Sequence, residues 1–242
     1  MDDRPRNPIR AIEHGLVVSC QAHGDHPLRD SSMLAALARC AEKGSAAAIR
    51  ADGPQDVERV RQDVSLPVIG IYKSSLSGGR FFITPDFGHA AQIVDAGADV
   101  VALEATRENR SDDQELEKLI RRVREELRVP VMADISTVDE GLRAWSMGAD
   151  LVATTLSGYT RESPPRDTPD YELLGTLAEE GVRVVAEGHV RTPEQVGELF
   201  ERGAYAVVVG TAITDPIAIT SWFVEAIEEY LKRETTGGGE KP

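Results

Sequence analysis

Seven polar side chains and one glycine stand directly after eight short apolar runs of the sequence. They supply two cations, three carboxylates, a hydroxyl and an amide, and they are Gln21, Arg50, Lys73, Glu104, Asp134, Thr155, Glu187 and Gly210. If the apolar runs are parallel strands of one barrel, these residues converge on a single mouth. Any one of them could be a rim residue in a structural ion pair, but polar residues at nearly every strand end favour an active site.

Lys73 and Glu187 are the candidate catalytic pair. Lys73 ends an apolar run with no charge nearby in the sequence. A lysine in a water-poor barrel mouth has its pKa lowered by desolvation, so it can serve as a base or as a Schiff-base nucleophile. Glu187 would stabilise the ammonium form, so we expect the two groups to titrate together. The alternative is a structural role for Lys73 as counter-ion to Asp134 or Glu104.

A phosphate site is predicted between residues 184 and 214. Two apolar runs, residues 184–186 and 206–209, end in Gly188 and in Gly210-Thr211. Neighbouring backbone N–H groups at the ends of the last two strands of a (β/α)8 barrel commonly bind a phosphate. We therefore expect Gly188, Gly210 and Thr211 to contact an anionic substrate. Four of the five histidines, at positions 23, 26, 89 and 189, have no metal-ligand spacing, so no metal is predicted. No other cofactor is expected.

The elements that would position these residues are eight apolar runs alternating with eight helical patterns, which indicates a parallel sheet covered by helices. Three segments, DAGADVVALEAT, SMGADLVATTLS and ERGAYAVVVGTA, repeat the order of helix end, small residues, strand and polar rim. This repeat favours a closed (β/α)8 TIM barrel over an open doubly wound sheet. We expect an N-terminal extension (1–14), one barrel domain (15–233) and a disordered tail (234–242).

Several local expectations follow. Ser31 or Ser32 should cap a helix that buries Met33, Leu34, Leu37 and Ala41. The third strand should end at Lys73 and be followed by a loop with Gly78-Gly79. Thr84-Pro85 should begin the next helix. The last helix, from about residue 217 to 232, is apolar enough either to close its own barrel or to pack across a homodimer.

Bulk properties narrow the class of protein. The chain has 242 residues, 41% of them hydrophobic and 28% charged, which suits one substantial core. A formal net charge of −14 argues against nucleic acid and anionic membranes as partners. Cys20 and Cys40 form no disulfide framework, and Cys20 is expected to be a buried free thiol. With no apolar run of about 18 residues and no signal peptide, we expect a cytoplasmic protein.

The motifs resemble one enzyme family over residues 15–223. They are GLVVSCQA (15–22), AAIRADG (47–53), LPVIGIYK (66–73), ITP (83–85), VMADIST (131–137), ATTLSGYT (153–160), VVAEGHVRTPEQ (184–195) and VVVGTAIT (207–214). Together they resemble the N-acetylmannosamine-6-phosphate 2-epimerase family, whose members have a ribulose-phosphate-binding barrel and act in sialic acid catabolism. The resemblance implies that Lys73 and Glu187 are catalytic and that Gln21, Arg50 and Asp134 bind the sugar.

The implied reaction interconverts N-acetylmannosamine 6-phosphate and N-acetylglucosamine 6-phosphate. Glu187 would move protons at the hemiacetal, which opens the ring and leaves an aldehyde at C1. The hydrogen on C2 then becomes acidic, and neutral Lys73 can remove it. A proton returned to the other face of the planar enolate gives the epimer, while Arg50 and Asp134 orient the sugar.

The sequence departs from the family pattern at four positions. Glu104 stands for a usual aspartate, His189 for a common arginine and Tyr72 for an aliphatic residue. Asp215 replaces an Arg or Lys that helps to bind the phosphate. Either the phosphate stays on the backbone N–H groups, with Asp215 capping the next helix and Arg191 or Arg161 supplying charge, or the substrate is an unphosphorylated amino sugar. A Schiff-base lyase or aldolase and a non-catalytic sugar-phosphate sensor are further alternatives.

Overall fold

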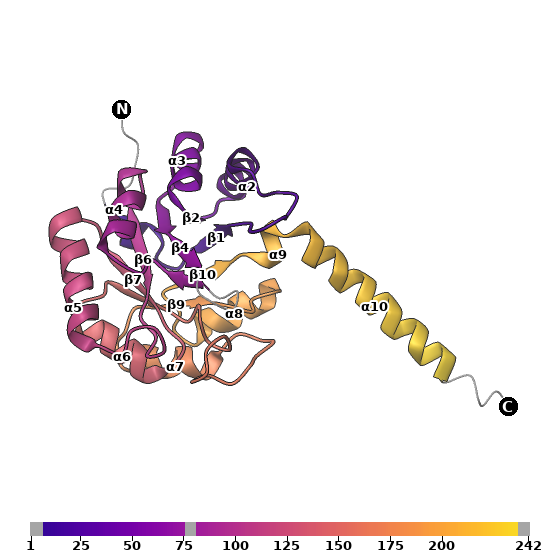
Figure 1. Cartoon of the computed structure of the whole chain (residues 1–242). Helices are drawn as coiled ribbons and strands as arrows, with labels where there is room; N and C mark the ends of the chain where they lie inside the picture. The colour runs from indigo at the N-terminus through magenta and orange to yellow at the C-terminus, as the bar shows by residue number, and fades with distance from the viewer. Residues whose placement is uncertain (1–6, 76–80, 237–242) are drawn as a thin grey trace.

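Eight parallel strands close into a barrel in the computed structural model, which describes residues 7–75 and 81–236 (Figure 1). The strand order around the barrel is β1-β10-β9-β8-β7-β6-β3-β2, and β1 closes the ring by pairing with β10. The strands are β1 Leu16–Cys20, β2 Ala48–Asp52, β3 Val68–Ile71, β6 Val100–Glu104, β7 Val131–Asp134, β8 Leu151–Ala153, β9 Val184–Glu187 and β10 Ala206–Val209. The predicted closed barrel is confirmed, and the open sheet is excluded.

Helices surround this barrel and connect successive strands (Figure 1). They are α1 Pro8–Ala11, α2 Ser31–Lys43, α3 Pro54–Asp63, α4 Phe87–Asp95, α5 Asp113–Arg122 with a π-helical continuation η1 Val123–Leu127, α6 Val138–Ser146, α7 Tyr171–Glu179, α8 Pro193–Glu201, α9 Thr211–Thr214 and α10 Pro216–Thr236. Side chains cap several of them: Thr137 and Thr192 each form a reciprocal capping box, at the starts of α6 and α8.

The apolar core has two layers. Alternate strand residues such as Val17 and Ile69 point into the barrel, and their neighbours such as Val18 and Val68 pack against the helices. Because both faces are buried, the strands read as continuous apolar runs. Ile12, just after α1, is fully buried in the inner layer. Part of the expected N-terminal extension therefore closes the barrel end opposite the polar mouth.

A two-stranded hairpin replaces part of the loop that the sequence predicted after the third strand. Strand β3 ends at Ile71, and Lys73 opens strand β4 (Lys73–Ser75), which pairs antiparallel with β5 (Phe81–Ile83). Gly78-Gly79 lies outside the described residues. The hairpin makes Lys73 part of a short sheet above the barrel, with Ile83 directly opposite.

Two predicted helix features were wrong. Thr84-Pro85 does not begin a helix, because the Thr84 hydroxyl donates to the Ala102 carbonyl (2.7 Å) and accepts from the Tyr72 N–H (3.1 Å); Asp86 caps α4 instead. Asp30, and not Ser31 or Ser32, caps α2. The side chain of Met33, which was expected to be buried, is exposed. The buried face of α2 is Leu34, Ala35, Ala38 and Ala41.

The chain leaves the barrel after strand β10. The short helix α9 follows Gly210, and α10 then projects away from the barrel as a long single helix (Figure 1). Helix α10 includes residues 234–236, which we assigned to the tail. The rest of the expected disordered tail, residues 237–242, lies outside the described residues.

Candidate active site

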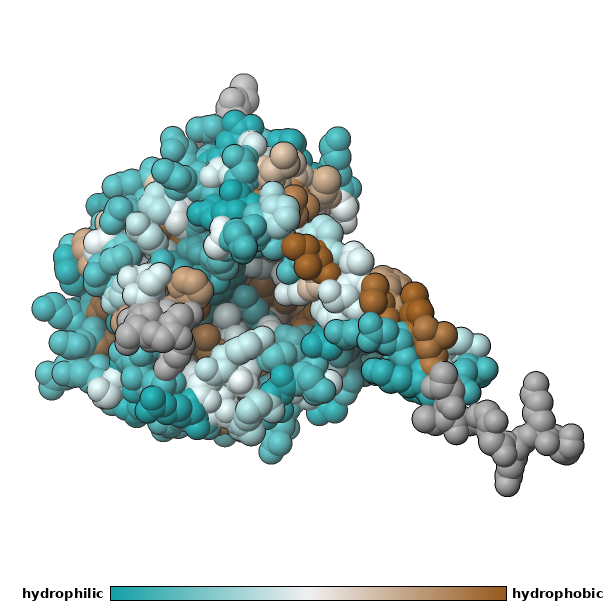
Figure 2. Space-filling model, turned by 45° about the vertical axis from the view of Figure 1, so that its right-hand side comes forward, coloured by the Kyte–Doolittle hydropathy of each residue, from teal (hydrophilic) through white to brown (hydrophobic). Residues whose placement is uncertain are grey.

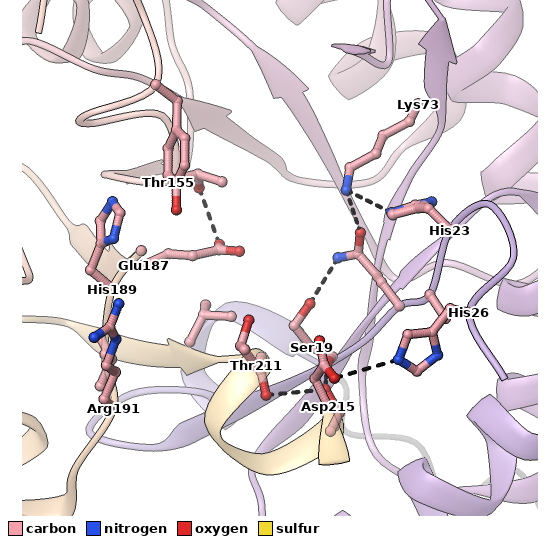
Figure 3. A pocket seen from close by; sticks show the side chains of 18 of the residues that line it. Ser19, His23, His26, Lys73, Thr155, Glu187, His189, Arg191, Thr211 and Asp215 are labelled. Carbon is pink, nitrogen blue, oxygen red and sulfur yellow. Dashed lines mark hydrogen bonds and ion pairs between the residues drawn. The ribbon is translucent and has the colours of Figure 1, made fainter. Parts of the chain in front are cut away.

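Two adjoining cavities open at the carboxyl ends of the strands. The first has a volume of about 460 Å³ and the second about 400 Å³, a size that suits a small ligand. Both are lined by Gln21, Lys73, Thr155 and Glu187; Gly188, Gly210 and Thr211 line the first, and Arg50 lines the second. Figure 3 shows Lys73 and Glu187 reaching toward the same space from opposite sides. Asp134 is fully buried beneath the cavities. The structure thus brings all nine predicted site residues together.

A buried ion-pair network forms the floor. Arg50 is 1% exposed and binds Asp134 through two bonds, Nη1 to Oδ1 (3.1 Å) and Nη2 to Oδ2 (2.6 Å). Its Nη1 also donates to Glu187 Oε2 (2.7 Å). The Thr155 hydroxyl lies 2.7 Å from Asp134 Oδ1 and 3.1 Å from Glu187 Oε2. Asp134 therefore reaches the cavities only through Arg50 and Thr155.

The buried cation Arg50 is shared by two carboxylates, Asp134 and Glu187. Burial opposes the charge of Arg50, but Asp134 and Glu187 more than offset it and raise the Arg50 pKa. Burial raises the pKa of Glu187; Arg50 opposes this rise and Asp134 adds to it. Asp134 has the bidentate contact with Arg50 and Glu187 a single one, so Glu187 is the carboxylate less well paired with the cation.

Lys73 belongs to the β4–β5 hairpin, and its side chain lies across the cavity from Glu187. Its backbone N–H donates to Asp52 Oδ1 (2.9 Å), which anchors β4 to the end of β2. Its Nζ donates to Gln21 Oε1 (2.8 Å) and lies 3.0 Å from His23 Nε2. Burial lowers the pKa of Lys73, with Asp52 opposing that shift. The partners of the amine are thus an amide and an imidazole, and Arg50 rather than Lys73 is the counter-ion of Asp134.

Glu104, the remaining rim carboxylate, lines the second cavity and is held by local hydrogen bonds. It is 2% exposed, and its carboxylate accepts hydrogen bonds from the Thr106 hydroxyl (2.6 Å) and the Asn109 amide (2.7 Å). Burial raises its pKa. Glu104 therefore does not pair with Lys73 either.

The predicted phosphate corner lies at the ends of β9 and β10. Gly188 has φ +101°, a conformation that residues with a side chain rarely adopt. Arg191 lines the same cavity as Gly188, Gly210 and Thr211, and its guanidinium packs 5.1 Å from the ring of Trp222 on α10. Arg161 does not line this cavity: its side chain is 88% exposed and pairs with Glu108. Of the two arginines considered for this corner, only Arg191 is in place.

Asp215 lines this corner and also caps α10. Its Oδ1 accepts from the backbone N–H groups of Ile217 (3.0 Å) and Ala218 (3.1 Å), as the cap interpretation expected. The Ala218 N–H contributes most to lowering its pKa. His26 Nε2 is 3.4 Å from the same oxygen. Because the Leu28 N–H donates to His26 Nδ1, the neutral imidazole carries its proton on Nε2 and donates it to Asp215.

Among the cavity residues not anticipated from the sequence are His23, Tyr159 and Trp222. His23 lies two positions after Gln21, so the alternation of an extended segment could have identified it. Tyr159 stacks on His189 with ring centroids 4.8 Å apart, a contact between two distant loops. Nothing in the sequence sets the direction of α10, and so nothing could place Trp222.

In residues 7–75 and 81–236, no group of three or more His, Cys, Asp or Glu side chains is arranged to hold a metal ion. Within the same residues, no helix has the length and apolar character needed to cross a membrane.

Comparison with known proteins identifies the family. Residues 34–229 match the family model described as "Putative N-acetylmannosamine-6-phosphate epimerase". The chain is 48% identical over 222 residues to the "Putative N-acetylmannosamine-6-phosphate 2-epimerase" of Cutibacterium acnes, covering 90% of this chain and 96% of the relative. This chain belongs to the N-acetylmannosamine-6-phosphate 2-epimerase family. A relative of the same name in Caldanaerobacter subterraneus subsp. tengcongensis is 45% identical over 223 residues, covering 91% and 94%.

Solved structures agree with membership of the N-acetylmannosamine-6-phosphate 2-epimerase family. The N-acetylmannosamine-6-phosphate 2-epimerase from Clostridium perfringens matches with a TM-score of 0.84 and 36% identity, covering 90% of this chain and 95% of that one. Thiamine phosphate pyrophosphorylase from Pyrococcus furiosus matches with a TM-score of 0.59 at 16% identity, covering 93% and 98%. The second match shows a shared barrel fold alone.

Proposed function

We propose that this protein interconverts N-acetylmannosamine 6-phosphate and N-acetylglucosamine 6-phosphate in amino sugar and sialic acid catabolism. The observation that carries the proposal is the pairing of Lys73, whose pKa is lowered by burial, with Glu187, whose pKa is raised by burial, across one cavity. A base that is readily neutral and a carboxyl group that readily holds a proton are what ring opening and C2 proton transfer require.

Glu187 opens the ring in this proposal. Its acid form donates a proton to the ring oxygen while its other oxygen accepts the proton of the C1 hydroxyl, so the ring C–O bond breaks and a C1 aldehyde forms. Glu187 ends this step protonated, as it began. Thr155 and Arg50, which contact its Oε2, orient the carboxyl group.

Lys73 then acts at C2. The neutral amine removes the C2 proton, and the electron pair of the C–H bond moves into an enolate with its charge on the C1 oxygen. Arg50 stays cationic in its buried network and supplies positive potential at this rim. The open-chain enolate turns about its C2–C3 bond, the Lys73 ammonium group returns a proton to the face of C2 opposite to the one that lost it, and ring closure gives the epimer.

The phosphate is placed at the corner of Gly188, Gly210 and Thr211. Backbone N–H groups there offer hydrogen bonds, and Arg191 supplies the positive charge that Asp215 does not. The Asp215 carboxylate is directed to the α10 N–H groups and His26, which limits its repulsion of the dianion. A doubly charged sugar phosphate does not diffuse through a bilayer, so we also propose that the enzyme works in the cytoplasm.

We propose further that the protein is a homodimer joined through α10. This helix has 21 residues and is therefore about 32 Å long. Its large apolar side chains are exposed: Ile217 (53%), Phe223 (71%), Val224 (47%), Ile227 (59%), Tyr230 (60%) and Leu231 (54%). Figure 2 shows brown, apolar surface along the projecting helix. A second copy suits this apolar surface because a two-fold axis lets each α10 cover the other barrel reciprocally.

Proton NMR in D₂O tests the enzymatic proposal. With N-acetylmannosamine 6-phosphate, the native protein should produce N-acetylglucosamine 6-phosphate, and Lys73→Ala should lower the rate by at least about 10²–10⁴-fold. Near-native turnover by Lys73→Ala would reject Lys73 as the base. If borohydride with substrate instead traps a covalent adduct on Lys73, the protein is a Schiff-base enzyme.

A further inference from the structure

His23 contacts the amine that the proposed function uses as its base. Its Nε2 is 3.0 Å from Lys73 Nζ, and Gln21 Oε1 is 2.8 Å from the same nitrogen (Figure 3). The Gln21 carboxamide is itself oriented, because its Nε2 donates to Ser19 Oγ at 2.8 Å. The imidazole of His23 packs against the ring of Phe81, with ring centroids 5.3 Å apart. The mechanism described above gives His23 no role.

The surroundings of His23 favour one tautomer. Its Nδ1 is 3.7 Å from Asp52 Oδ2, so the proton of the neutral ring is favoured on Nδ1, facing that carboxylate. Nε2 is then left as an acceptor that faces Lys73. Burial, followed by the charge of Lys73, lowers the pKa of His23, which favours the neutral ring.

The geometry of a neutral amine gives this contact a consequence. A neutral lysine has two N–H bonds and one lone pair in a tetrahedral arrangement. Gln21 Oε1 and His23 Nε2 accept the two N–H bonds, which leaves the lone pair as the remaining direction. Because Nζ borders the cavity shared with Glu187, the lone pair is directed toward the substrate.

We propose that His23 is a positioning residue that, with Gln21, fixes the rotation of the Lys73 amine so that its lone pair faces C2 of the substrate. The inference rests on the proposed function. When Lys73 takes the C2 proton, two N–H bonds stay with Gln21 and His23, and the new N–H bond is the one that faces the enolate. The open-chain enolate must turn its other face to Lys73 before it is reprotonated; the proton then returned to carbon is preferentially the one removed, provided that return is faster than rotation of the ammonium group.

Substitutions at His23 separate positioning from a merely structural role. His23→Leu removes the acceptor, and His23→Gln offers an amide oxygen in its place. The matched control is His89→Gln, because His89 packs on Tyr72, next to Lys73, but does not line either cavity. Each protein is assayed with N-acetylmannosamine 6-phosphate in D₂O, and early product is analysed for protium or deuterium at C2.

We expect His23→Leu to lower kcat by about tenfold or more while KM changes by no more than about twofold. The fraction of early product that retains protium at C2 should fall, because the freed ammonium group rotates and exchanges with solvent. His23→Gln should recover both quantities in part, and His89→Gln should match the native protein.

The outcomes separate this inference from the proposed function. A native protein that does not epimerise the substrate would reject both. An active native protein would retain the function but lose the inference in either of two cases: His23→Leu keeps the native kcat and protium retention, or His23→Gln is as impaired as His23→Leu. Thermal unfolding of each variant shows whether it is folded, and an unfolded His23→Leu leaves His23→Gln and His23→Asn to decide by the same isotope measurement.

Discussion

At the scale of single residues, Arg50 shows how one buried cation can divide two carboxylates between different roles. Asp134 takes the bidentate contact and holds Arg50 in place, whereas Glu187 has a single contact and borders the cavity. Burial raises the pKa of Glu187, and the nearby charge of Asp134 adds to that rise. On this ground we propose that Glu187 carries the proton and that Asp134 supports Arg50.

Glu187→Gln should separate ring opening from C2 exchange. Glutamine keeps the shape but cannot carry the hemiacetal proton, so turnover of the cyclic sugar should fall by about 10²-fold or more. Exchange at C2 of an open-chain analogue should survive better. Equal losses on both substrates would mean that Glu187 serves the C2 step or only positions Lys73.

The same variant makes a prediction about pH. Burial lowers the pKa of Lys73, and the negative charge of Glu187 opposes that shift. Wherever Glu187 is ionised, Glu187→Gln removes this charge and should lower the Lys73 pKa further. Because the base is active above its pKa, the low-pH limb of C2 exchange should move to lower pH in Glu187→Gln, as measured by the exchange rate of the analogue across a pH series.

Asp215→Asn should improve phosphate binding while keeping the α10 cap. Asparagine can still accept the N–H groups of Ile217 and Ala218 but carries no charge, so KM for the 6-phosphate should fall while kcat is unchanged. Asp215→Ala loses the cap as well and should be less stable by about 1 kcal/mol. Faster turnover of unphosphorylated N-acetylmannosamine by the native enzyme would contradict the phosphate assignment.

The acid dependence of this cap has a definite sign. The folded-state pKa of Asp215 is lowered, chiefly by the Ala218 N–H. Its contribution to stability is therefore fully present above the ordinary carboxyl pKa and is lost as pH falls through the lowered value. Asp215→Asn should unfold with a weaker dependence on pH in the acid range.

At the scale of elements, buried carboxylates fix the loops that follow the strands. Glu140 at the start of α6 is fully buried and accepts from the backbone N–H groups of Ser136 (2.8 Å), Thr137 (3.1 Å) and Arg107 (2.6 Å). This loop begins two residues after Asp134. A helix cap and the ion-pair floor are thus built by the same segment.

Glu140→Ala should lower the free energy of unfolding by about 3 kcal/mol, because it leaves several buried donors unsatisfied. The matched comparison is Gln195→Ala in the exposed capping box of α8, which should cost about 1 kcal/mol, since water can replace the lost acceptor. Urea unfolding measures both. Similar losses for the two variants would show that burial of the acceptor does not decide the cost.

Local sequence patterns predicted the barrel because each barrel strand is apolar and buried and several helices begin at a recognisable cap. The same logic failed at Thr84-Pro85, which has the same residue types as the true helix start Thr192-Pro193. What differs is tertiary: the Thr84 hydroxyl bonds to Ala102 on a neighbouring strand. Likewise, Lys73 was identified from its strand end, but its contact with His23 depends on two loops far apart in the sequence.

At the scale of the whole molecule, the barrel has one closed end and one open end. Helix α1 and Ile12 close the amino-terminal end, while the carboxyl ends of the strands surround the cavities. The whole chain has a formal net charge of −14, whereas the mouth of the barrel holds the cations Lys73, Arg50 and Arg191. The apolar side chains of α10 could be recognised in the sequence. They indicate that the helix is covered, but not whether its own barrel or a second copy of the chain covers it.

The dimer proposal makes the final prediction. Sedimentation of the native protein should give twice the mass of one chain. Phe223→Glu combined with Ile227→Glu places two charges in the apolar surface of α10, so the variant should sediment as a monomer and unfold at lower temperature. Glu225→Lys, on the opposite face of α10, also changes the charge by two and should remain dimeric. A native monomer, or a double variant that keeps the native mass, would show that a second copy does not cover this helix.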